Sequence, residues 1–157
     1  RQLAKEFKVM DTDDDWVEIY TDGACKGNPG PGGWGAYFKF QNSEKELFGG
    51  EIQTTNNRME LIAVIEAIKS ISESKKLKIF TDSKYVKNGI QDWIINWEKN
   101  GWKTASKKPV ANKDLWIQLN KIKNIRKIEW NWVKGHSGNL GNEKADYLAN
   151  KGVESVI

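Results

Sequence analysis

Four acidic residues stand where a folded sheet would bring them together, although they lie far apart along the chain. Asp22 ends the segment WVEIYTD and Asp82 ends LKIFTD, and both segments have the β-branched and aromatic residues typical of strands. Glu60 lies in the first turn of a helix expected from TTNNRMELIAVIEAIKSIS, and Asp146 lies within a last helix, NEKADYLANKG. Strands that run the same way bring their carboxyl ends to one edge of a sheet, where ligand sites commonly form. We therefore expect the four carboxylates to share one cleft.

Carboxylates gathered in one cleft repel one another, and protonation or bound cations relieve that repulsion. Oxygen ligands suit hard ions such as Mg²⁺ or Mn²⁺, and two such ions about 3.5–4 Å apart are the usual apparatus for in-line displacement at phosphorus. Each residue also has a structural alternative. Glu60 could form an N-cap motif with Asn57, Asp82 could cap the next helix, Asp22 could be a turn residue and Asp146 a solvated helix position. Only the constellation favours metal-dependent chemistry over these alternatives.

The elements that must position these carboxylates follow the order β-β-β-α-β-α-β-α, which predicts an α/β domain with a five-stranded mixed sheet flanked by helices. Further strands are expected over residues 33–40, 46–52 and 126–133, and the first three strands form an antiparallel meander. A short helix, SKYVKNGI, is expected to stop at Gly89, and the last helix at Gly152. Another helix is expected between the tryptophan-rich segment and the last strand.

Composition limits the classes of protein that this chain can belong to. It has 157 residues with 38% hydrophobic residues, which is enough for one packed domain over residues 16–157. Residues 1–15 lack a strand pattern and are expected to form a flexible lead-in. One cysteine excludes a disulfide scaffold and a zinc site of the cysteine-rich kind, and it indicates a reducing, cytoplasmic setting. The most apolar run is far too short to span a bilayer, so no membrane partner is expected.

Five extended motifs carry a family resemblance. The segments YTDGACKGNPGPGGWG, TTNNRMEL, FTDSKYVKNGI, GWKTASKKPVANKDLW and WVKGHSGNLGNEKADYLA occur in the order and at about the spacing seen in type 1 ribonuclease H. The resemblance covers Trp16 to Gly152 and is closest to bacterial ribonuclease HI with a basic protrusion. It implies the ribonuclease H-like fold and endonucleolytic hydrolysis of the RNA strand of an RNA–DNA hybrid, leaving 3′-hydroxyl and 5′-phosphate ends.

The same resemblance assigns catalytic roles. It implies that two Mg²⁺ ions, for which Mn²⁺ can substitute, are held by Asp22, Glu60, Asp82 and Asp146. The only histidine, His136, lies in the loop KGHSG, and the resemblance makes it the catalytic histidine that assists proton transfer or product release. A near-neutral imidazole suits this role. A lone histidine is also commonly structural.

Substrate contacts are assigned in the same way. Asparagine side chains can donate and accept hydrogen bonds to sugar hydroxyls and base edges, and the 2′-hydroxyl distinguishes RNA from DNA. The family's contacts with the hybrid correspond to Gly23, Cys25, Asn28, Asn56, Asn57 and Glu60. Thr55 and Asn112 match a pocket for a DNA-strand phosphate. Some relatives have arginine at the position of Gln53, so phosphate binding in this pocket would be weaker here. Helix capping is the structural alternative for the Asn/Thr cluster.

Residues 93–116, which we call the handle, have five lysines against two acidic residues. This net +3 accounts for most of the chain's net charge of +4. By the resemblance the handle is a basic protrusion that grips the DNA strand, with Trp93, Lys99, Lys107 and Lys108 as expected contacts. Tryptophans can stack on bases, but four at this spacing favour a small local core. Binding is expected to weaken steeply with salt.

Two alternatives to a free-standing hybrid nuclease remain open. The basic, tryptophan-rich handle would also suit a non-catalytic nucleic-acid-binding module, although four intact carboxylates favour an enzyme. The nuclease domain of a reverse transcriptase shares the motifs. The expected partner is an RNA–DNA hybrid in either enzymatic case, and a monomer is expected.

Overall fold

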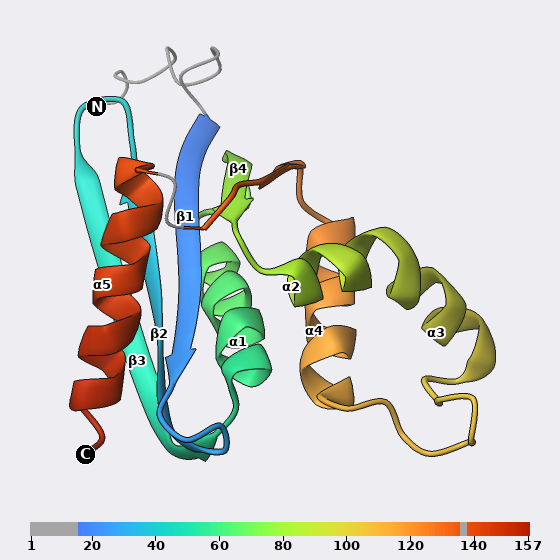
Figure 1. Ribbon diagram of the computed structural model, residues 1–157. Helices are drawn as coiled ribbons and strands as arrows, with labels where there is room; N and C mark the ends of the chain where they lie inside the picture. Colours follow the sequence, from blue (N-terminus) through green and yellow to red (C-terminus); the bar gives the residue numbers. More distant parts are fainter. Residues whose placement is uncertain (1–15, 136–137) are drawn as a thin grey trace.

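The computed structural model describes residues 16–135 and 138–157, which form one five-stranded sheet between helices (Figure 1). The strands are β1 (Trp16–Cys25), β2 (Gly30–Lys39), β3 (Glu44–Thr54), β4 (Lys76–Thr81) and β5 (Ile128–Trp132). They lie in the order β3-β2-β1-β4-β5, with β1, β2 and β3 antiparallel and with β4 and β5 parallel to β1. The mixed sheet and its initial meander are therefore confirmed.

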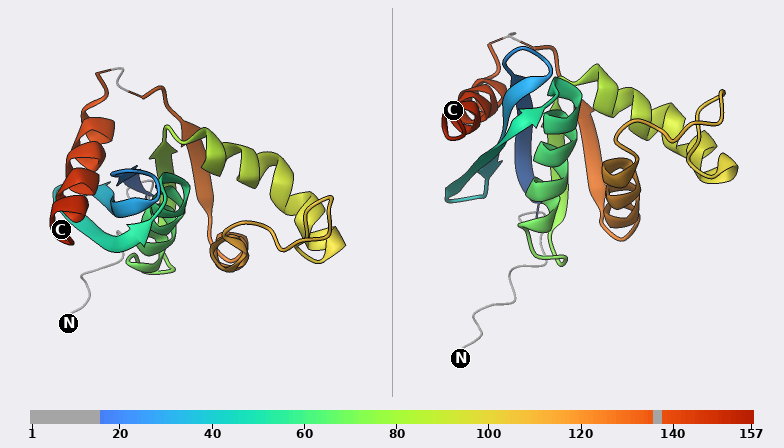
Figure 2. Two further views of the ribbon diagram at one scale, coloured as in Figure 1. Left: turned by 60° about the horizontal axis from the view of Figure 1, so that its bottom comes forward. Right: turned by 90° about the horizontal axis from the view of Figure 1, so that it is seen from below.

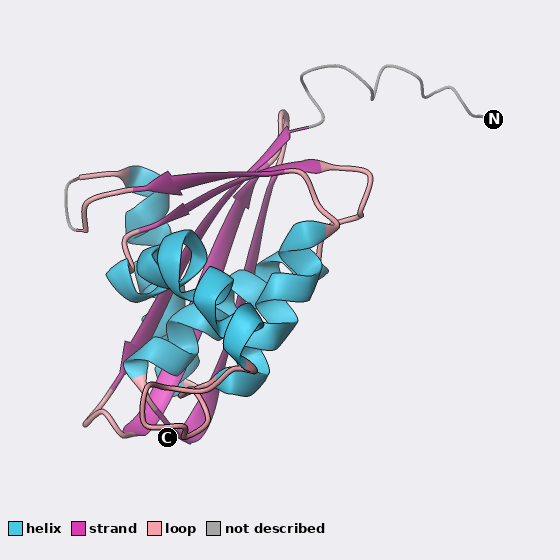
Figure 3. Ribbon diagram, turned by 90° about the vertical axis from the view of Figure 1, so that its right-hand side faces the viewer, coloured by secondary structure: helices cyan, strands magenta, loops and turns pink. Residues whose placement is uncertain are grey.

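Helices cover the sheet on both faces (Figure 2, right). They are α1 (Asn56–Lys69), α2 (Lys84–Asn88), α3 (Ile94–Asn100), α4 (Lys113–Asn124) and α5 (Leu140–Glu154). Helix α5 packs on β1, β2 and β3, while α1 packs on the other face of β1 and β2 with α4 beside it. Figure 3 looks from the α3 side, where helices lie in front of the twisted sheet. No helix within the described ranges is long and apolar enough to cross a membrane.

The core lies between the sheet and α1. Alternation along β1 sends Val17, Ile19 and Thr21 to one face, and all three are buried. They meet the apolar side of α1, where Leu61 and Ile65 are also buried. Period-2 and period-3.6 patterns thus meet as the sequence predicts, and this contact holds α1 against the centre of the sheet.

Helix α5 approaches the opposite face unusually closely because β2 has glycines there. A Cβ on Gly35 would lie 2.6 Å from the carbonyl oxygen of Ala145, and one on Gly33 would clash with the backbone at Ala149. A contact limited by backbone rather than by side chains fixes how far α5 stands from the sheet. Asp146 is on this helix, so the same contact sets its height above β1 and β2.

Two glycines expected to stop helices do not do so. Gly89 has helical φ and ψ and begins a wide helical turn, η3 (Gly89–Trp93), that joins α2 to α3 without a break. A side chain there would clash with the indole of Trp116. Gly152 lies inside α5, against the backbone of Gly49. Both predictions were wrong for one physical reason. These glycines permit close tertiary contacts, whereas the prediction of a helix stop considers only the neighbouring residues in the sequence.

An arginine fixes the far end of α1. The guanidinium of Arg126 donates hydrogen bonds to the carbonyl oxygens of Ile68, Ile71 and Ser72, at 3.1, 3.1 and 2.9 Å. Carbonyls at a helix carboxyl end have no partner within the helix, so a cation that bonds them stabilises that end. This links the segment before β5 to the helix that carries Glu60.

Candidate active site

Three carboxylates from three different elements meet at one edge of the sheet. Asp22 lies within β1, Asp82 directly follows β4 and Glu60 lies on α1, and one oxygen of each is within 4.8 Å of the others. Because α1 begins at Asn56, Glu60 stands one turn further into the helix than the sequence suggested. Gly23 makes the approach possible, since a Cβ there would lie 2.6 Å from the amide nitrogen of Glu60. The parallel pairing of β1 with β4 thus brings together residues distant in sequence.

The fourth carboxylate approaches from α5. Asp146 is half-buried on the edge of a helix face whose Ala145, Leu148 and Ala149 are buried against the sheet. It lies outside the tight group of three, but its charge acts on Asp22 and on Glu60. Helices on opposite faces of the sheet therefore both contribute a carboxylate to the same edge.

Burial and mutual repulsion make this cluster hold protons tightly when no cation is present. The pKa of Asp22 is raised to about 8, first by burial and then by the charge of Asp82, although the amide of Gly23 donates to its carboxylate at 2.9 Å. The pKa of Glu60 is raised well above its usual range, mainly by burial and next by Asp22. Asp22 and Glu60 are only 7% and 6% exposed. The site therefore has more negative charge than its own hydrogen bonds can stabilise.

The donor set fits a divalent cation. Glu60 Oε1 is buried and accepts no hydrogen bond from any residue in the described ranges. A buried carboxylate oxygen without a partner is costly, and a cation bound to it would remove that cost. Among the described residues, the possible ligand atoms that converge here are carboxylate oxygens, which hard ions such as Mg²⁺, Mn²⁺ and Ca²⁺ prefer.

The structural alternatives for Asp22, Glu60 and Asp82 do not hold. Thr55, rather than Asn57, caps α1, because its Oγ1 accepts a hydrogen bond from the amide of Arg58 at 3.2 Å. Ser83, rather than Asp82, caps α2 in the same way, accepting from the Val86 amide at 3.1 Å. Neither Glu60 nor Asp82 is needed to cap the start of a helix, and Asp22 is a buried strand residue instead of a turn residue.

Five of the residues expected to bind substrate lie together beside the start of α1. A cavity of about 360 Å³ is lined by Asn28, Thr55, Asn57, Tyr85, Ala111 and Asn112. Asn28 Oδ1 accepts a hydrogen bond from the Asn56 amide at 2.9 Å, which ties the glycine-rich turn to the helix. Thr55 and Asn112, the residues matched to a phosphate pocket, thus do line one cavity.

Two contacts here were not foreseen from the sequence. The hydroxyl of Tyr85 accepts hydrogen bonds from Asn112 Nδ2 at 3.2 Å and from Trp116 Nε1 at 3.0 Å, so it orients one wall of this cavity. Cys25 is half-buried, and its Sγ lies 3.4 Å from the carbonyl oxygen of Thr54, a weak hydrogen bond that joins the end of β1 to the end of β3. Gln53 is exposed at the end of β3.

The tryptophans of the handle form a local core, as expected. Trp93, Trp97 and Trp116 pack with ring centroids 5.6 to 6.3 Å apart, and Trp102 lies 6.0 Å from Trp97. Such tilted and edge-on pairs are favourable aromatic contacts. Figure 2 (left) shows α3 and the following loop extending away from the sheet, and Lys99, Lys107 and Lys108 are exposed there.

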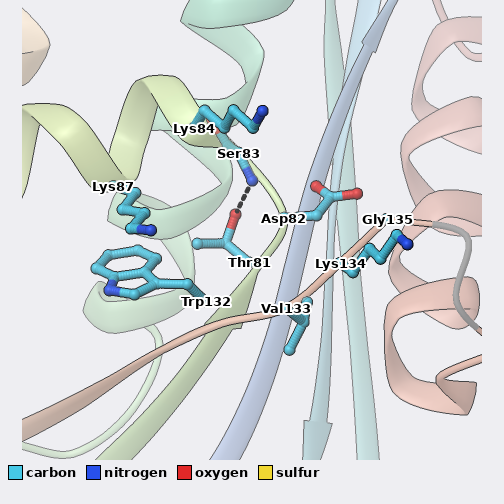
Figure 4. Close-up of a pocket in the computed structure, with 9 residues that line it drawn as sticks. All are labelled: Thr81, Asp82, Ser83, Lys84, Lys87, Trp132, Val133, Lys134 and Gly135. Carbon is cyan, nitrogen blue, oxygen red and sulfur yellow. Dashed lines mark hydrogen bonds between the residues drawn. The ribbon is translucent and has the colours of Figure 1, made fainter.

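The loop that follows β5 passes directly beside Asp82. A Cβ on Gly135 would lie 2.7 Å from Asp82 Oδ2, so a side chain at that position would collide with the carboxylate. His136 is the next residue, and it lies outside the described residues. The sequence also did not single out a cavity of about 330 Å³ lined by Asp82, Lys84, Lys87, Trp132, Lys134 and their neighbours (Figure 4). The available signal was that lysines closely follow the ends of β4 and β5.

A mixed sheet with this carboxylate cluster at its edge defines a class, the nucleases that use divalent metal ions to hydrolyse phosphodiesters. The family model for RNase H matches residues 14–154. A ribonuclease H of Stutzerimonas stutzeri is 60% identical over 140 residues, 89% of this chain and 93% of that protein. The structure of LC9-RNase H1, a type 1 RNase H with the type 2 active-site motif, matches with TM-score 0.81 at 33% identity, over 90% of this chain and 74% of that one. A foamy viral protease-reverse transcriptase in complex with RNA/DNA hybrid has the same fold, with TM-score 0.77 at 23% identity, over 89% of this chain and 20% of that one.

The chain belongs to the ribonuclease H family. The resemblance inferred from the motifs is thereby confirmed. Ribonucleases H are hydrolases that depend on divalent metal ions and cleave the RNA strand of RNA–DNA hybrids, and this is the function of the chain.

Proposed function

We propose that the chain is an endonuclease that cleaves RNA–DNA hybrids within the RNA strand by a two-metal-ion mechanism, leaving 3′-hydroxyl and 5′-phosphate ends. The observation that carries this proposal is the convergence of Asp22, Glu60 and Asp82 within 4.8 Å, with Asp146 acting on the same group. These four residues would hold two Mg²⁺ ions, with Mn²⁺ able to substitute. Ions held there would supply activation of a water nucleophile and neutralisation of charge on the leaving oxygen.

The protein's own residues hold and orient the reacting parts. Burial of Asp22 and Glu60 keeps bulk water from the carboxylates, and the hydrogen bond from the Gly23 amide fixes the Asp22 side chain. His136 follows Gly135, which touches Asp82, so we assign it proton transfer at the departing oxygen or assistance in product release. Its replacement is expected to lower the rate without unfolding the protein.

Recognition of the hybrid is proposed to involve both strands. Gly23, Cys25, Asn28, Asn56, Asn57 and Glu60 would face the sugars and base edges. Thr55 and Asn112 would hold a phosphate of the DNA strand in the cavity that they line, with Gln53 leaving that grip weaker. The handle, with Trp93 in its aromatic core and Lys99, Lys107 and Lys108 exposed, would contact the DNA strand further along.

The proposal extends to the organisation of the protein. Residues 16–157 would form the catalytic domain, with the handle at about 93–116 and residues 1–15 as a lead-in. We propose that the enzyme acts in the cytoplasm, because one partly buried cysteine suits a reducing compartment. We also propose that it is a monomer. Sedimentation of the purified protein, with and without hybrid, tests whether the protein is a monomer.

A cleavage assay tests the function directly. A hybrid with a labelled RNA strand is incubated with Mg²⁺, and matched double-stranded RNA and double-stranded DNA serve as competing substrates. We expect internal cuts in the hybrid RNA alone, 5′-phosphate ends on the products and complete loss of activity in EDTA. The Asp22→Asn variant should bind the hybrid without cutting it, whereas Asp92→Asn, at an exposed position on η3, should cut normally. Tight binding without cleavage under any divalent ion would identify a non-catalytic binding module instead.

The reverse transcriptase alternative is less well supported. The bacterial ribonuclease H matches at 60% identity over nearly its whole length, whereas the viral enzyme matches at 23% over a fifth of its chain. A domain adapted to work beside a polymerase would need the rest of that protein to engage the hybrid. Efficient cleavage by residues 1–157 alone would therefore favour the free-standing enzyme.

A further inference from the structure

A second cavity adjoins the carboxylate cluster on the side of β5. It has a volume of about 330 Å³ and is formed where the parallel strands β4 and β5 end, between the residues that follow each strand (Figure 4). Asp82 lines it and also belongs to the acidic cluster, so the two sites share a wall. None of its lining residues belongs to the cavity that Thr55 and Asn112 line.

The charge of this cavity is opposite to that of the cluster beside it. Three lysines and one carboxylate line it. Figure 4 shows Lys87 extending toward the indole of Trp132 on one side and Lys134 lying beside Asp82 and Gly135 on the other, with Lys84 turned away from both. Within residues 16–135 and 138–157, neither Lys84 nor Lys87 forms an ion pair with an acidic side chain. The ammonium groups of the three lysines thus lie near the active site, and those of Lys84 and Lys87 have no acidic partner among the described residues.

Backbone geometry keeps the cavity open and in place. Ser83 donates from its amide to Thr81 Oγ1 at 3.1 Å and caps α2, so the turn from β4 to Lys84 and Lys87 is held firmly. On the other wall, Gly135 packs against Asp82 without a side chain. A phosphate group is small enough to enter such a volume, and lysine is a common point-charge ligand for phosphate.

We propose that the cavity between Lys87 and Lys134 binds a phosphate of the RNA strand next to the bond that is cleaved. The inference rests on the proposed function, since the strand cut at the carboxylates must run past Asp82 in one direction. The DNA strand has its own expected phosphate cavity beside Thr55, which leaves this one, at the wall of the cluster, to the cleaved strand. Holding the adjacent phosphate would position the scissile one and lower the KM.

The test combines protein variants with single neutral linkages in the RNA. One set of hybrids has one RNA-strand phosphate at a time replaced by a methylphosphonate, on either side of a unique cleavage position. Lys87→Gln and Lys134→Gln are combined in one variant and compared with Lys87→Arg, which keeps the charge. The control is Lys76→Gln, at the opposite end of the same strand β4. Thermal unfolding checks that each variant is folded.

On the unmodified hybrid we expect kcat/KM of the double variant to fall about tenfold, mainly through KM, as loss of a charge-assisted contact implies. The salt slope should fall by about one. Lys87→Arg should retain most activity and Lys76→Gln all of it. At one neutral linkage the double variant and the parent enzyme should become equal, because the contact is then absent from both.

Two results would overturn the inference. One is a double variant that behaves like Lys76→Gln on the unmodified hybrid. The other is a tenfold defect that persists at every neutral linkage, which would mean that the lysines act on something other than an RNA phosphate. Both are read against a parent enzyme that cleaves the hybrid. Failure of the parent to cleave would refute the proposed function itself. That outcome differs from both results above, in which the parent enzyme is active.

Discussion

Replacing Asp22 with asparagine is expected to stabilise the metal-free protein while abolishing cleavage. The carboxylate is 7% exposed and stands within 4.8 Å of two others, and its pKa is raised from 3.8 to about 8. The folded state therefore binds this proton more tightly than the unfolded state does. Between about pH 4 and pH 8 the free energy of unfolding should fall as pH rises, and above about pH 8 it should level off.

The magnitude follows from the size of the shift. About four pKa units at about 1.4 kcal/mol each place the full cost of ionising Asp22 at roughly 6 kcal/mol above pH 8. The asparagine amide must also be buried, and Glu60 and Asp82 continue to repel each other in the variant, so the net gain is smaller. We expect the Asp22→Asn variant to be about 2–4 kcal/mol more stable than the parent at pH 8 in EDTA.

Urea unfolding followed by tryptophan fluorescence measures this directly, since the chain has eight tryptophans that report on both the handle and the sheet. Titrations from pH 5 to pH 9 in EDTA should show a falling curve for the parent and a flatter one for Asp22→Asn, with Asp92→Asn following the parent. Millimolar Mg²⁺ should raise the stability of the parent and leave Asp22→Asn almost unchanged, because only the parent retains the full ligand set. Lower stability of Asp22→Asn at pH 8 in EDTA would refute the electrostatic reasoning.

Three further changes test other parts of the structure. Arg126→Ala should lower the free energy of unfolding by about 1–3 kcal/mol in urea titrations, since three carbonyl oxygens at and just after the end of α1 each lose one donor; an unchanged midpoint would contradict this. Gly89→Ala should cost about 1–3 kcal/mol by forcing the Trp116 indole to move, and a variant as stable as the parent would show that this contact is loose. Lys107→Gln with Lys108→Gln should weaken hybrid binding and lower the salt slope by about one to two, with unchanged Mg²⁺ dependence of cleavage; an unaltered slope would place the handle away from the phosphates.

Features that depend on the local period of the chain could be predicted from the sequence. Val17, Ile19 and Thr21 share the buried face of β1, as their alternation indicates, and the order of elements is sufficient to predict the mixed sheet. Asp22 and Asp82 were found because each was expected to end a strand, and parallel strands end at a common edge. Asp82 does follow β4, whereas β1 continues three residues beyond Asp22. These inferences need no knowledge of which side chains touch across the fold.

Features that depend on contacts between distant segments could not be predicted. Glycine is a residue type that commonly ends helices, so Gly89 was expected to be a helix stop. Only the position of Trp116 explains why it continues a helix instead. The Tyr85 hydroxyl joins Asn112 and Trp116 from another helix, and no periodic pattern indicates that bond. The lysine-lined cavity arises because β4 pairs with β5, which brings Lys87 and Lys134 to one place.

The glycine-lined contact between β2 and α5 has a consequence for how this enzyme can change over evolutionary time. In most proteins a core residue can become larger while its neighbour becomes smaller, and the packed helices shift in position by small amounts when this happens. Here the backbone of Gly35 rests on the backbone of α5, so substitutions elsewhere in the core cannot move that helix closer, and any side chain at the contact moves it away. The distance from Asp146 to the strand-borne carboxylates is thereby insulated from ordinary sequence drift, and selection on catalysis at Asp146 is also selection for glycine at positions that touch no substrate.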